Sequence, residues 1–171
     1  YANELRLLIE HCVDHQGVTP ADFPLARISQ SQLDALPLDP RQIQDIYPLA
    51  PMQQGMLFHT LHEQAAGNYL NQMRLDVSGL DPERFRQAWQ AVLDRHDILR
   101  TSFIWQGELE QPLQVVHSHL KMPFTLLDWQ TSTDQKQALD DLAADELRRG
   151  FDLNHAPLLH HILQPVRKPG S

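Results

Sequence analysis

The sequence predicts a mixed α/β fold, in which helices and strands follow one another without the regular alternation of parallel βαβ units. Apolar residues recur at helical spacing in three segments: 2–13, 82–93 and 134–149. Strand-like composition or alternation marks four shorter ones: 69–77, 101–105, 113–117 and 124–127. The 171 residues, 42% hydrophobic and 21% charged, suit one domain of ordinary size or pieces of two.

The N-terminal part should contain a helix, a proline-rich turn and a short helical segment. An amphipathic helix is expected from about Ala2 to Val13, with its apolar face formed by Leu5, Leu8, Ile9 and Cys12. Prolines between residues 19 and 25 disfavour helix in the residues before them. Residues 29–36 should make one helical turn, with Leu33 and Leu36 facing inward.

Two helices and a strand are predicted between residues 48 and 95. Pro51 suits the first turn of a helix, whose face should be mostly core: Met52, Met56, Leu57, His59, Thr60 and Leu61. Period-two alternation from Tyr69 to Val77 predicts a half-buried strand. Asp81 should cap the next helix, with Pro82 in its first position and a core-facing stripe of Phe85, Ala88, Trp89, Val92 and Leu93.

The C-terminal part should add three strands, a helix and the start of a further strand. The strands are expected at Thr101–Trp105, Leu113–His117 and Phe124–Leu127, with a turn near Gln106-Gly107 joining the first two. The helix should run from about Asp134 to Arg149 and stop at Gly150. The segment after Phe151 reads as a strand entry.

Composition argues against several functions. The formal charge of −8 and the pI near 5.6 argue against nucleic-acid binding, which relies on clustered Lys and Arg. The sequence has no run of about 18 apolar residues and its start is not a signal peptide, so we expect no membrane association. Cys12 is the single cysteine and cannot form an internal disulfide, which fits a cytoplasmic protein.

Two motifs carry a family resemblance. The first is Tyr47-Pro48-Leu49-Ala50-Pro51-Met52-Gln53-Gln54-Gly55-Met56-Leu57-Phe58-His59, and the second is Arg95-His96-Asp97-Ile98-Leu99-Arg100-Thr101-Ser102-Phe103. In this order and spacing they resemble the first two motifs of condensation domains of nonribosomal peptide synthetases. The first motif carries Gly55-Met56 where many members have Arg and a bulky residue, which leaves the subtype open.

The resemblance implies a division of the chain and a reaction. Residues 1–36 resemble the C-terminal tail of an upstream epimerization or condensation-type domain, 37–45 a linker that opens with Pro37-Leu38-Asp39-Pro40, and 46–171 the N-terminal part of a condensation domain. The implied fold is the first lobe of a two-lobed, chloramphenicol-acetyltransferase-like protein. The parent enzyme would form an amide bond between peptidyl and aminoacyl thioesters. An epimerization tail would also imply a donor ending in a D-residue.

The resemblance further implies partners and site residues. The partners are carrier domains and the remaining lobe; phosphopantetheine belongs to the carriers, and no cofactor is bound directly. Gln53, Arg95, His96 and Arg100 are the implied structural motif residues. Arg100 would pair with the aspartate of the family's catalytic His-His-x-x-x-Asp-Gly motif. Because that motif is absent here, we expect Arg100 to have no partner inside this chain and the isolated chain to be inactive.

Other readings of the sequence remain open. His160-His161 lacks the Asp-Gly and lies too close to Phe151 to replace the catalytic motif. His117-x-His119, and His155 with that pair, lack the spacing of a structural zinc site, so no metal is expected. The chain could also be a non-catalytic carrier-docking module, or a free-standing acyltransferase of this fold that has lost its motif.

Overall fold

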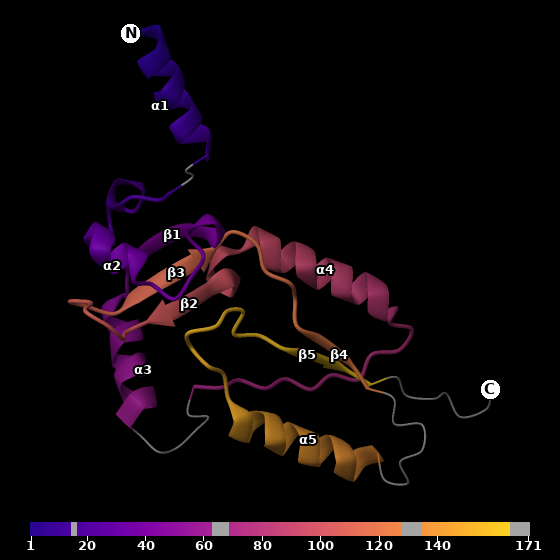
Figure 1. Ribbon diagram of the computed structural model, residues 1–171. Coiled ribbons are helices and arrows are strands. Elements are labelled where there is room, and N and C mark those ends of the chain that lie inside the picture. The colour runs from indigo at the N-terminus through magenta and orange to yellow at the C-terminus, as the bar shows by residue number, and fades with distance from the viewer. Residues whose placement is uncertain (15–16, 63–68, 128–134, 165–171) are drawn as a thin grey trace.

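The computed structural model describes residues 1–14, 17–62, 69–127 and 135–164 (Figure 1). The α-helices are α1 (Ala2–Asp14), α2 (Gln30–Asp34), α3 (Pro51–His62), α4 (Pro82–Arg95) and α5 (Gln135–Arg149). Short 3-10 helices are η1 (Pro20–Asp22), η2 (Pro40–Gln42) and η3 (Asp97–Arg100). The strands are β1 (Ile43–Pro48), β2 (Thr101–Ile104), β3 (Leu113–His117), β4 (Phe124–Leu126) and β5 (His161–Leu163). The predicted mixed α/β class is confirmed.

An antiparallel sheet of order β1-β3-β2 carries the main core. All five residues of β3 are buried, because this strand lies between the other two. Leu113 and Val115 of β3 join Ile104 of β2 and residues of β1 in one apolar cluster. Residues 23–36, from the N-terminal part, pack on the same cluster.

Strand β1 was not predicted, and its register explains why. Its two core residues, Ile43 and Ile46, are three positions apart, whereas a regular strand turns every second side chain to one face. The pairing with β3 shifts between Ile43 and Asp45, so a bulge adds one residue on β1. The extra residue lets both isoleucines join the core, and it also hides the strand from a period-two search.

A second layer lies beside this sheet. Strands β4 and β5 pair in parallel, and α5 forms the connection between them. Figure 1 shows this pair between α4 on one side and α5 on the other. The predicted strands β2, β3 and β4 are confirmed within one residue at each end. The predicted cap of α4 is also confirmed: Asp81 accepts from the main-chain N–H groups of Glu83 and Arg84. Gly150 follows α5 with φ of +64°, as expected of a helix terminator.

Two predicted elements differ from the structure. Residues 69–77 run extended but are assigned to no strand, and their side chains are exposed on both faces apart from the half-buried Leu70; Met73 is 82% exposed. Alternation alone does not make a strand, because a strand also needs a hydrogen-bonding neighbour. Polar contacts instead place this segment against α5, through Gln72 to the carbonyl of Ala143 and through the Arg74–Asp140 ion pair.

The Met-rich face of α3 is the second correction. Only Leu57 of this helix is buried, and Met52, Met56 and Leu61 are exposed. Much of the apolar surface of this helix is therefore uncovered within the described chain. Helix α1 forms as predicted and projects away from the body (Figure 1), with Leu5, Leu7 and Ile9 exposed. The side chains of Leu8 and Cys12 on its predicted face lie outside the described set.

Candidate functional site

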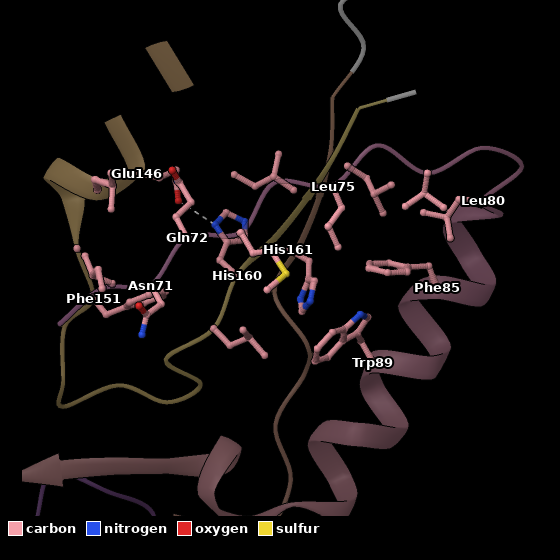
Figure 2. A pocket seen from close by; sticks show the side chains of 18 residues that line it. Asn71, Gln72, Leu75, Leu80, Phe85, Trp89, Glu146, Phe151, His160 and His161 are labelled. Atoms are coloured by element: carbon pink, nitrogen blue, oxygen red, sulfur yellow. Dashed lines mark hydrogen bonds and ion pairs between the residues drawn. The ribbon is translucent and has the colours of Figure 1, made fainter. Parts of the chain in front are cut away.

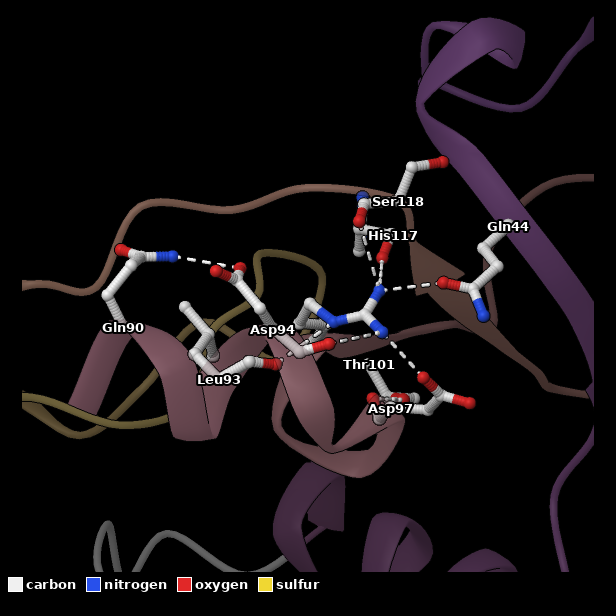
Figure 3. A network of polar contacts seen from close by, with 9 residues as sticks. Gln44, Gln90, Leu93, Asp94, Asp97, Thr101, His117 and Ser118 are labelled. Atoms are coloured by element: carbon white, nitrogen blue, oxygen red, sulfur yellow. Dashed lines mark hydrogen bonds and ion pairs between the residues drawn. The ribbon is translucent and has the colours of Figure 1, made fainter. Parts of the chain in front are cut away.

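Arg100 occupies the most highly connected polar position of the described chain, at the junction of α4, η3 and β3. Its side chain is only 4% exposed. The guanidinium Nε donates to the carbonyl of Leu93 at 3.0 Å, and one terminal nitrogen donates to the side chain of Gln44 at 2.8 Å. The same nitrogen donates to the carbonyls of His117 and Ser118. Figure 3 shows these acceptors converging from separate elements.

The other terminal nitrogen of Arg100 completes a helix cap. It donates to the carbonyl of Asp94 at 3.3 Å and to the carboxylate of Asp97 at 2.5 Å. Leu93 and Asp94 lie in the last turn of α4, where main-chain carbonyls have no partner inside the helix. A cation at this end also interacts favourably with the helix dipole. Arg100 therefore fixes the end of α4 to the end of β3.

The expectation that Arg100 has no partner inside this chain is wrong. Every nitrogen of its guanidinium donates to a group from residues 44–118. The family resemblance implied a carboxylate partner in a distant motif. Main-chain carbonyls are also hydrogen-bond acceptors, and here they take most of the guanidinium's donors.

Gln53 joins α3 to the opposite end of β3. Its side-chain oxygen accepts from the main-chain N–H of Ala50 at 2.8 Å, which holds the start of the helix. Its amide nitrogen donates to the side chain of Gln114 at 3.3 Å, and Gln114 donates to the carbonyl of Pro48 at 3.1 Å. Gln114 is buried on the central strand. The motif glutamine thus acts as a tie between helix and sheet.

The four predicted motif residues do not gather at one site. Gln53 and Arg100 act at opposite ends of β3, because Gln114 lies near its start and His117 at its end. Arg95 and His96 are exposed at the end of α4. The main-chain N–H of His96 donates to the carbonyl of Val92, so this residue ends the helix. The side chain of Arg95 makes no hydrogen bond or ion pair with any other described residue.

A buried hydroxyl–imidazole pair was missed by sequence reasoning. The Ser102 hydroxyl lies 2.8 Å from Nε2 of His117, and both residues are buried. Burial lowers the pKa of His117, and electrostatic interactions with Arg100 and His155 lower it further. The imidazole is therefore neutral at pH 7 and joins β2 to β3. A serine that is 0% exposed has no access to a substrate. No spacing in the sequence signals this pair.

An apolar pocket of about 530 Å³ lies between α4, α5, β5 and the extended segment 70–77 (Figure 2). The ring of His161 packs against Trp89, with centroids 4.1 Å apart, and against Phe85 at 5.5 Å. Its Nδ1 is buried without a hydrogen-bond partner in the described residues. Burial and the neighbouring His160 lower the pKa of His161.

His160 faces a different set of groups from its neighbour. Its Nδ1 lies 3.1 Å from the Glu146 carboxylate and its Nε2 lies 2.9 Å from the Thr125 hydroxyl. The carboxylate thus orients His160, whereas no carboxylate of the described residues contacts the ring of His161. The two histidines' lack of a catalytic role stays a prediction. Pro165 and the residues after it lie outside the described chain.

Two other types of site are absent from the described residues. No group of three or more His, Cys, Asp or Glu side chains among them is placed to hold a metal ion. No helix in the same residues has the length and apolar character needed to cross a membrane.

Comparison with known proteins gives a consistent match. The sequence profile described as "Condensation domain" matches residues 43–167. A linear gramicidin synthase of Brevibacillus parabrevis is 45% identical over 167 residues, which cover 95% of this chain and 3% of that protein. A mycosubtilin synthase of Bacillus subtilis is 38% identical over 159 residues, covering 88% of this chain and 6% of that protein.

A solved structure also shares the fold. The condensation domain of the monacolin K polyketide synthase MokA superposes with a TM-score of 0.51 at 16% identity, covering 72% of this chain and 28% of that one. The chain therefore spans a small fraction of its curated relatives and about a quarter to a third of this solved structure.

Proposed function

The chain belongs to the condensation domain family of nonribosomal peptide synthetases, and on that premise we propose that its parent protein forms amide bonds between carrier-bound thioesters. The amine of an aminoacyl thioester would attack the carbonyl of a peptidyl thioester. The C–S bond breaks, the thiol of the donor's phosphopantetheine leaves, and the amine loses a proton. The family match over residues 43–167 is the observation that carries this proposal.

The described residues would contribute scaffold to this reaction. Such chemistry requires the amine and the thioester to be held in a fixed relative position, which depends on a rigid protein frame. Gln53 and Arg100 tie α3 and α4 to the two ends of β3, and both lie in the motifs that carry the resemblance. The histidine that positions or deprotonates the amine in the family belongs to a His-His-x-x-x-Asp-Gly motif, which none of the 171 residues supplies.

The proposed partners follow from the same premise. Carrier domains would present both substrates on phosphopantetheine arms, and the remaining lobe of the domain would cover apolar surface now exposed. Met73, Leu75 and Val77 on the extended segment, with Met52 and Phe58 on α3, are the exposed residues that support this covering. The division into 1–36, 37–45 and 46–171, the D-residue preference of the donor and a cytoplasmic location remain parts of the proposal.

An assay on the parent synthetase tests the reaction. Donor and acceptor carriers are loaded with defined aminoacyl groups, and dipeptidyl thioester on the acceptor carrier is followed by mass spectrometry. The proposal predicts product that requires both loaded carriers. If both carriers stay loaded and bind the protein, yet no dipeptidyl thioester forms, the protein is a non-catalytic docking module instead.

A further inference from the structure

The N-terminal segment 18–38 packs into the core of the antiparallel sheet, although it precedes the region that matches the condensation family. Four of its residues are buried: Phe23, Ala26, Leu33 and Leu36. They form one cluster with Ile43, Ile46, Ile104, Leu113 and Val115 of the sheet. Val18, Ile28 and Leu38 pack at the edge of that cluster. A free linker would not bury its apolar residues among those of three strands.

Polar contacts hold this segment in the same place. The side-chain oxygen of Gln32 accepts from the main-chain N–H of Ser29 at 2.8 Å, which caps α2. The amide nitrogen of Gln32 donates to the carbonyl of Glu108 at 2.7 Å, in the connection between β2 and β3. One side chain thus both shapes the segment and attaches it to a part of the chain 76 residues away.

The segment makes its turns with its own hydrogen bonds. The main-chain N–H of Ala26 donates to Phe23, and that of Leu36 donates to Leu33. Each buried pair is three residues apart, so a single turn brings both members to the sheet. Arg27, with φ of +53°, redirects the chain between the two turns. Leu25, between the buried positions, points outward and is 64% exposed.

We propose that residues 18–38 are a docking element, through which the end of the upstream domain is attached to the β1-β3-β2 sheet of the condensation domain. The partner of this sheet face would then be the tail of the preceding domain rather than a carrier or the second lobe. This inference rests on the proposed division of the chain, in which residues 1–36 are such a tail. The two domains would meet through a fixed apolar contact.

Hydrogen exchange on the whole chain tests the docking element. If the segment is docked, the amides of Ala26, Leu33 and Leu36 should be protected and should open in the same cooperative step as those of β3. Amides in 18–38 that exchange at the rates of an unfolded peptide, while β3 stays protected, would overturn the proposal.

A pair of variants tests the contact itself. Phe23→Ala removes a buried ring and should speed opening of both the segment and β1 by on the order of 100-fold or more, as expected for large-to-small core substitutions. Leu25 lies in the same segment but is mostly exposed, so Leu25→Ala should change the opening rate by less than about threefold. If the Phe23→Ala variant does not fold, Phe23→Leu can replace it, and this milder substitution should speed opening by a smaller factor. Equal effects of Phe23→Ala and Leu25→Ala would show that the ring is not docked.

The readout separates this inference from the proposed reaction. Exchange rates do not depend on carriers or catalysis, so an inactive parent in the thioester assay would leave the docking result unchanged. Conversely, fast exchange of 18–38 in a synthetase that forms product would refute the docking element and would not affect the proposed reaction.

Discussion

Replacing Arg100 by alanine should lower the free energy of unfolding of this chain by about 3–5 kcal/mol. The substitution leaves the carbonyls of Leu93 and His117, both in buried surroundings, without their donor. A buried acceptor without a partner costs about 1–3 kcal/mol. Loss of the side chain also leaves a gap between α4 and β3, although water entering the gap would offset part of the cost.

The ion pair contributes little to this estimate. Asp97 is 54% exposed, and pairs with a solvent-exposed member are worth about 0–1 kcal/mol. Asp97→Ala should therefore cost less than about 1 kcal/mol. Arg100→Lys keeps the charge but places one ammonium where several donors are needed, so its cost should lie between those of the other two variants.

Urea unfolding of the whole chain, followed by circular dichroism, measures these differences. Arg95→Ala is the matched control, because it removes an arginine of the same motif that is exposed, and it should shift the unfolding free energy by less than about 0.5 kcal/mol. If Arg100→Ala costs no more than Arg95→Ala, or if Asp97→Ala reproduces its full effect, the buried carbonyl contacts of Arg100 do not stabilise the chain as proposed.

Three further predictions concern other parts of the same chain. Gln53→Ala should lower the unfolding free energy by about 1–2 kcal/mol because it leaves Gln114 with one partner fewer. Met52 is exposed on the same helix, so Met52→Ala should have little effect in the same urea unfolding experiment. Burial lowers the pKa of His117, so the unfolded state binds more protons, and stability should fall as pH drops below about 6.5 toward the lowered pKa. His117→Gln should flatten this slope in the same unfolding measurements. The apolar side chains exposed on 69–77 should make the chain self-associate or bind a hydrophobic dye at micromolar concentration. A chain that is monomeric in ultracentrifugation and binds no dye would contradict the proposal that a second lobe covers these side chains.

Local signals in the sequence predicted much of the fold. Asp81 and Pro82 mark the start of α4 because capping is a property of adjacent residues. Leu33 and Leu36 were expected to face inward, and the short helical turn places both in the core. Strand β3 has the predicted bounds, since a run of apolar and β-branched residues between turns is typical of a buried strand.

The parts that sequence reasoning missed depend on distant partners. The bulge of β1 is defined only by its pairing with β3. Residues 69–77 alternate like a strand, yet no described segment pairs with them. The acceptors of Arg100 are mainly main-chain carbonyls, which every residue has and no motif can indicate. Likewise, the tie between Gln53 and Gln114 spans 61 residues.

We propose that this chain contributes scaffold and supplies no catalytic group for amide formation, because its sequence contains no His-His-x-x-x-Asp-Gly motif. The direct measurement incubates the chain with a loaded donor carrier and a loaded acceptor carrier, and follows dipeptidyl thioester by mass spectrometry, beside a complete condensation domain as positive control. We expect product with the complete domain. With this chain we expect no more product than with the loaded carriers alone. Product that forms with this chain and is lost in the His161→Ala variant would contradict the proposal.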